Sequence, residues 1–116
     1  MSDDNTISIP QGRAALQQLK DTLSQQFGQI PGGPVSDMID KRLDAISDAL
    51  TKLNQAEMSS GTVAINAAAT GMKNPIKNLN ALKDQIQSIS DDVGRAAEVL
   101  GGVDQFISGV KACFGV

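Results

Sequence analysis

The chain has 116 residues, of which 41% are hydrophobic, so its composition is that of one small folded domain and not of a disordered segment. It has no histidine and one cysteine, which excludes the usual zinc sites and the Ser-His-Asp and Cys-His catalytic groups, so we expect no enzyme, no metal and no cofactor. Its net charge is −3 without a basic stripe, so we expect no nucleic-acid partner.

The first residues of the chain predict a flexible tail and synthesis in the cytoplasm. Residues 1–9 are polar and acidic, and we expect a flexible tail there, followed by one helical domain over residues 10–116. The first twelve residues lack the basic start and apolar stretch of a secretory signal. We therefore expect synthesis in the cytoplasm, with any export independent of a classical signal peptide. The apolar region 99–116 is interrupted by Asp104 and Lys111, which argues against a membrane span.

The first predicted helix covers about residues 10–27. Pro10 suits a first helical turn, and three leucines follow at spacings of three and four: Leu16, Leu19 and Leu23. Residues 28–34 then hold three glycines and two prolines, which a helix interior tolerates poorly. This segment is predicted to be a loop.

The second predicted helix covers about residues 36–70. Ser36 is a favourable N-cap, and Asp37 places negative charge at the positive end of the helix dipole. The apolar positions repeat with spacings of four and three: Ile39, Leu43, Ile46, Leu50 and Leu53. The helix either continues past Gly61 or breaks near it.

The third predicted helix is the longest, at about residues 75–114. Its apolar positions alternate strictly between spacings of three and four, which is a coiled-coil signal. These positions form the heptad seam: Leu79, Leu82, Ile86, Ile89, Val93, Ala96, Leu100, Val103, Ile107, Val110 and Phe114. Because the phase continues across Gly101 and Gly102, we favour one unbroken helix, with a break at this glycine pair as the alternative.

These elements predict an all-α, coiled-coil-like bundle. Helices 36–70 and 75–114 would form a long antiparallel hairpin, and the helix at 10–27 would cover about half of it. The half made by residues 59–92 would then leave part of the heptad seam without cover. A second copy of the chain, or another helical protein, would supply that cover.

The predicted interface therefore consists of the heptad seam without Ala96, together with two glycines beside it. Small residues recur every seven positions at Gly94, Gly101, Ser108 and Gly115, which would let another helix approach closely. The predicted interface residues are Leu79, Leu82, Ile86, Ile89, Val93, Leu100, Val103, Ile107, Val110, Phe114, Gly94 and Gly101.

The expected function is that of a non-enzymatic structural or interaction protein. It would assemble through the heptad seam as a homo-oligomer, or as a small partner of a larger helical protein. Its size, helical plan and aromatic-poor composition resemble those of bacterial subunits and substrates of specialised secretion or contractile injection systems. The alternative is a membrane-active, pore- or translocator-type component that inserts the small, nearly uncharged stretch at residues 63–72.

Overall fold

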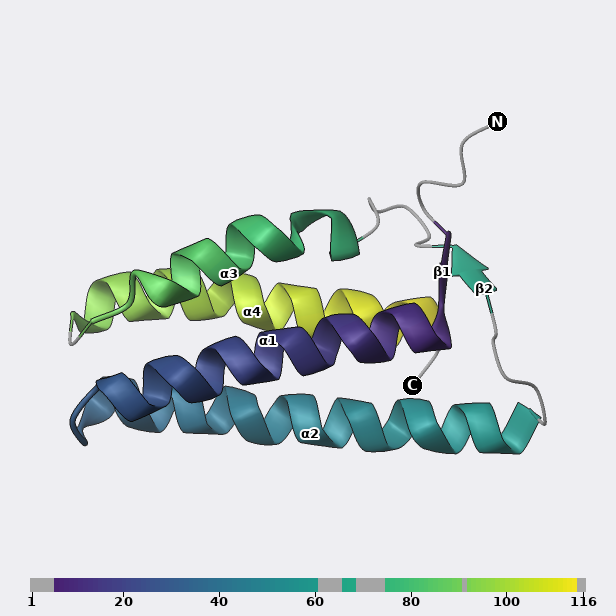
Figure 1. Cartoon of the computed structure of the whole chain (residues 1–116), viewed down its shortest axis with the longest axis horizontal. Helices are drawn as coiled ribbons and strands as arrows, with labels where there is room; N and C mark the ends of the chain where they lie inside the picture. The colour runs from purple at the N-terminus through teal and green to yellow at the C-terminus, as the bar shows by residue number, and fades with distance from the viewer. Residues whose placement is uncertain (1–5, 61–65, 69–74, 91, 115–116) are drawn as a thin grey trace.

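The computed structural model of this chain describes residues 6–60, 66–68, 75–90 and 92–114. These residues form an all-α helical bundle, with four α-helices and a small two-stranded ladder at one end (Figure 1). The predicted all-α helical bundle is therefore confirmed, but two shorter hairpins replace the long antiparallel hairpin predicted from residues 36–70 and 75–114. Two of the predicted helices have different bounds, and both differences change which residues are open to a partner.

The first two helices form an antiparallel hairpin. Helix α1 runs over Ile9–Gln29 and helix α2 over Pro34–Ser60, which confirms the helix predicted at 10–27. The turn between them requires glycine, because Gly33 has a φ of +149°, a conformation that residues with a Cβ rarely adopt. The carbonyl oxygen of Gly33 then accepts a hydrogen bond of 3.0 Å from the backbone N–H of Asp37, which closes the first turn of α2.

A short ladder replaces part of the predicted tail and part of the second helix. Strand β1, Thr6–Ser8, pairs antiparallel with strand β2, Asn66–Ala68. Ile9 follows β1 directly, opens α1 and is fully buried, so residues 6–9 belong to the folded domain and not to a tail. A helix that continues to residue 70 is wrong, because α2 ends at Ser60 and β2 is extended. Residues 1–5, 61–65 and 69–74 lie outside the described residues.

The last part of the chain folds into a second hairpin. A 3₁₀ helix, η1, covers Pro75–Asn78 and leads into α3, Leu79–Gln87, and α4 covers Val93–Phe114. The prediction of one helix over residues 75–114 is therefore wrong. The glycine pair, which was the alternative place for a break, lies inside α4.

Side chains, and not glycine or proline, end α3 and start α4. The Ser88 hydroxyl donates a 2.6 Å hydrogen bond to the carbonyl oxygen of Gln85 in the last turn of α3. Asp92 precedes α4, and its Oδ1 accepts hydrogen bonds from the backbone N–H groups of Gly94 (3.0 Å) and Arg95 (3.3 Å). This is the geometry of an N-cap, which satisfies donors that have no partner inside the helix.

The four helices form a closed ring around one core. Helix α1 packs on α2 and α3, and α4 packs on α2 and α3 from the other side. Figure 1 shows the two hairpins stacked, with α1 and α3 running in the same direction along the bundle. Helix α1 therefore covers the part of the heptad seam that was predicted to need a partner chain.

Candidate interaction surface

The heptad seam lies in the core of this single chain. Eight of the predicted interface residues are buried, with exposed fractions of 7% or less: Leu79, Leu82, Ile86, Ile89, Leu100, Val103, Ile107 and Val110. Phe114 is half-buried and packs against the same core. Because α3 folds back on α4 and α1 covers both, these side chains pack against other helices of the same chain.

Val93 is different from the rest of the heptad seam. Its side chain is 48% exposed at the first residue of α4, although Ile89 and Ala96 on either side of it in the repeat are 2% and 0% exposed. The break between α3 and α4 removes Val93 from the row that its spacing predicts.

The predicted small-residue stripe points away from the core. A methyl group added at Gly101 would meet no atom within 4 Å, and one added at Gly94 would meet only Oδ1 of Asp92, at 3.4 Å. Ser108 is exposed, and Gly115 lies outside the described residues. Within the described part of the chain, neither glycine is therefore explained by the close approach of another helix.

Two alanines extend this stripe along the same side of α4. Ala97 and Ala112 are exposed and lie within about one helical face of the glycines. We call the resulting set the α4 outer row: Gly94, Ala97, Gly101, Ser108 and Ala112. The sequence pattern does not single out the two alanines, because alanine is common on both buried and exposed faces of helices.

The glycine next to Gly101 provides a contrast. A methyl group at Gly102 would lie 3.5 Å from Cδ1 of Leu82 in α3, an ordinary contact distance. At Gly12 in α1 it would lie 3.1 Å from Cε2 of Phe114 and 3.3 Å from Cγ1 of Val110. Gly12 and Gly102 thus face neighbouring helices of the chain, whereas Gly101 faces outwards.

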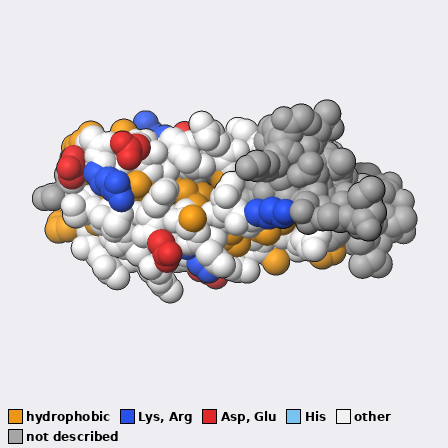
Figure 2. Space-filling view, turned by 90° about the horizontal axis from the view of Figure 1, so that it is seen from above, with side chains coloured by type: hydrophobic (Ala, Val, Ile, Leu, Met, Phe, Trp, Pro, Cys, Tyr) orange, Lys and Arg blue, Asp and Glu red, His pale blue; other side chains and the backbone are white. Residues whose placement is uncertain are grey.

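Ion pairs flank the α4 outer row. Arg95 and Glu98 approach to 3.8 Å on α4, and Asp104 pairs with Arg42 of α2 at 2.9 Å. The flanks therefore carry both signs of charge. A view of the bundle from above its orientation in Figure 1 shows separate acidic and basic side chains among uncharged polar atoms, with apolar atoms visible between them (Figure 2).

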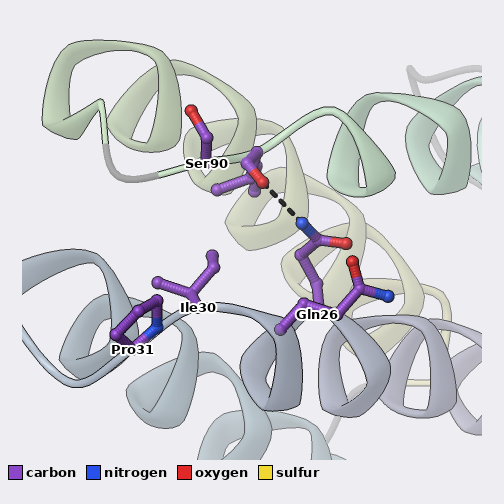
Figure 3. A pocket seen from close by; sticks show the side chains of 6 residues that line it. Gln26, Ile30, Pro31 and Ser90 are labelled. Atoms are coloured by element: carbon purple, nitrogen blue, oxygen red, sulfur yellow. Dashed lines mark hydrogen bonds between the residues drawn. The ribbon is translucent and has the colours of Figure 1, made fainter.

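A hollow of about 300 Å³ lies where the turns of the two hairpins meet (Figure 3). Its lining residues are Gln26, Gln29, Ile30, Pro31, Ile89 and Ser90. The Gln26 side chain is 7% exposed, and its Nε2 donates a hydrogen bond to the carbonyl oxygen of Ile89. None of these side chains is ionisable or a strong nucleophile, so the hollow offers no acid, base or activated nucleophile for catalysis.

Two other kinds of site, a metal site and a membrane span, were sought among the described residues. Groups of three or more His, Cys, Asp or Glu side chains that could hold a metal ion do not occur there. No helix among those residues is both long and apolar enough to span a membrane. Of the proposed membrane-inserting stretch at 63–72, residues 66–68 form β2 and the others lie outside the described residues.

Comparisons with protein-family models, with curated proteins and with solved structures found no match to this chain.

Proposed function

We propose that this chain is a non-enzymatic helical protein that packs against an α-helix of another protein chain, with the α4 outer row as its contact surface. The observation that supports this most directly is Gly101. An interior helical glycine is less stable than alanine by about 0.5–1 kcal/mol. Since a methyl group at this position meets no atom of the described residues within 4 Å, packing among those residues does not require glycine there.

The α4 outer row suits a helical partner because small side chains let two helix axes come close. Helices pack with their axes about 8–10 Å apart, and the side chains at the contact decide the distance. Larger apolar side chains of the partner would lie over Gly94, Ala97 and Gly101. The ion pairs made by Glu98 and Asp104 with arginines would form a polar rim of mixed charge, which is the usual edge of such a contact.

Gly101→Leu tests this proposal, and Gly102→Ala is its matched control. Both replace a glycine in the same turn of α4, but only the first adds a side chain to the α4 outer row. The tagged wild type and both variants would be purified from the source cells, and bound proteins would be compared by quantitative mass spectrometry. Light scattering would report self-association of each purified chain.

We expect one helical protein to bind the wild type and Gly102→Ala but not Gly101→Leu, and self-association through the α4 outer row would show the same order. Overpacking a contact typically removes about 1–3 kcal/mol, or roughly five- to 150-fold in affinity. Circular dichroism would show whether both variants remain folded. Equal binding by all three proteins would exclude the α4 outer row as the contact surface.

A further inference from the structure

The break between α3 and α4 occurs in a segment that has no residue incompatible with a helix. The connection, Ser88–Asp92, contains neither glycine nor proline. The connection between α1 and α2 is different, because it contains Gly32 and Gly33 and the second of these has a φ of +149°. The first hairpin is therefore fixed as a turn by the backbone of Gly33, whereas residues 88–90 and 92, the described part of the second connection, include no positive φ.

The chain leaves α3 with a nearly helical backbone. Ser88 has φ −88° and ψ −5°, in the right-handed helical region. The N–H groups of Ser88 and Ile89 donate 3.0 Å hydrogen bonds to the carbonyl oxygens of Gln85 and Ile86, in the tighter i to i−3 pattern of a 3₁₀ turn. A helical hydrogen-bond pattern therefore continues for two residues beyond the end of α3.

Side chains occupy the backbone groups that a continuous helix would use. In such a helix, the carbonyl oxygen of Ile89 would accept a hydrogen bond from the N–H of Val93, four residues later. In the hairpin, it accepts one from Nε2 of Gln26 in α1. Likewise, Oδ1 of Asp92 accepts from the N–H groups of Gly94 and Arg95, which a continuous helix would use internally.

The heptad phase also passes through the connection without a shift. Ile86, Ile89, Val93 and Ala96 follow one another at spacings of three, four and three. Only Val93 among these four is exposed in the hairpin, at 48%. In a continuous helix it would fall into line with Ile89 and Ala96, on the face that the rest of the heptad seam buries.

We propose that two copies of this chain bind each other by exchanging α4. The connection straightens, α3 and α4 become one helix, and α4 of each copy packs on α1, α2 and α3 of the other. The partner is a second copy because this chain presents, on α2 and α3, the surface that α4 already fits. Exchange of an identical element is an established route to dimers, and it leaves the α4 outer row facing outwards. The proposal is thus independent of the function proposed above.

Val93→Pro is the sharpest test. Val93 is the first residue of α4, a position where proline is favoured because its missing N–H has no helical partner. In a continuous helix the same proline would remove the bond to Ile89 and clash with the preceding turn. The matched control is Val93→Ala, which removes the same exposed side chain but keeps the N–H. Asp92→Ala acts in the opposite direction, because it removes the cap that stabilises the hairpin.

The mass of each protein would be measured by light scattering from micromolar to millimolar concentration. Wild type and Val93→Ala are expected to form a dimer as the concentration rises. The dimerisation constant of Val93→Pro is expected to be at least tenfold weaker, and that of Asp92→Ala about tenfold stronger. Circular dichroism would show that the proline variant folds. The proposal is overturned if Val93→Pro folds and dimerises like the wild type, or if Asp92→Ala remains a monomer throughout.

An intrachain distance distinguishes exchange from two closed copies lying side by side. Spin labels would be placed at the exposed positions Asn80 and Gln105 in a Cys113→Ser background, and the labelled chain diluted with unlabelled protein. In the hairpin these positions are near each other, because Leu82 lies beside Gly102. In one helix they would be about 38 Å apart. A dimer that shows only the short distance would overturn the exchange, even if the proline variant fails to fold.

Discussion

The burial of the heptad seam within one chain can be tested with the same substitution at two of its positions. Val103 and Val93 both lie in α4, and both belong to the heptad seam, but their exposed fractions are 0% and 48%. Valine to alanine removes two methyl-sized groups, worth about 1.6 kcal/mol of transfer free energy when the side chain is fully buried. A buried cavity adds to this loss, whereas the better helix propensity of alanine offsets up to about 0.5 kcal/mol.

We therefore expect Val103→Ala to lower the free energy of unfolding by about 2 kcal/mol. Val93→Ala should change it by less than about 0.5 kcal/mol, because a half-exposed side chain loses about half the transfer term, or about 0.8 kcal/mol, and the better helix propensity of alanine offsets up to about 0.5 kcal/mol of that loss. Urea unfolding followed by circular dichroism measures both, since the chain has neither tryptophan nor tyrosine for fluorescence. With a typical urea dependence, the first change would move the midpoint by about 1 M. Equal losses at both positions, or an unchanged midpoint for Val103→Ala, would show that the monomer does not bury the heptad seam as described.

Three further substitutions test other contacts of the bundle. Gly12→Leu should lower the free energy of unfolding by about 1–3 kcal/mol, measured by thermal unfolding, because a Cβ there lies 3.1 Å from the Phe114 ring; an unchanged melting temperature would place α1 and α4 further apart. Arg13→Ala removes a 2.7 Å ion pair with Glu57, which links α1 to α2 near the surface, so the loss should be below about 1 kcal/mol and smaller in 1 M salt. Leu100→Asp puts a charge at a fully buried position and should leave the chain unfolded by circular dichroism, whereas a folded variant would contradict the burial of Leu100.

The sequence predicted the first helix, most of the second and the course of the chain through the glycine pair. In each case the helix was predicted from apolar residues at spacings of three and four. The turn before α2 was predicted from its glycines and prolines. Gly101 and Gly102 did not end α4 because Leu100 and Val103 on either side of them are fully buried, so packing holds the helix.

The break at residues 88–92 could not be read from the sequence by the same rules. Ser88 and Asp92 are good capping residues, but both are also common on exposed helix faces, and only the structure shows their hydrogen bonds. The contribution of Gln26, 63 residues away from Ile89, is a tertiary contact that has no local signal. The strand β2 was missed for a related reason, because an Ala-rich segment favours a helix unless a partner strand such as β1 is available.

An apolar repeat predicts that a row of side chains is buried, but it does not predict whether the same chain or another chain covers that row. The heptad seam would have the same spacing in the closed hairpin, in an exchanged dimer or on a larger partner. Val93 distinguishes the closed hairpin from the exchanged dimer. Its side chain is half-exposed in the closed hairpin and would join the buried row in the straightened helix. Gly101 faces away from the core, so a substitution there tests a contact on the outside of the bundle and not the burial of the heptad seam. The two positions lie two turns apart on α4, so their substitutions act on different surfaces. The double variant Val93→Pro/Gly101→Leu should therefore lose both the exchange of α4 and the contact at the α4 outer row. The losses in binding free energy should be additive.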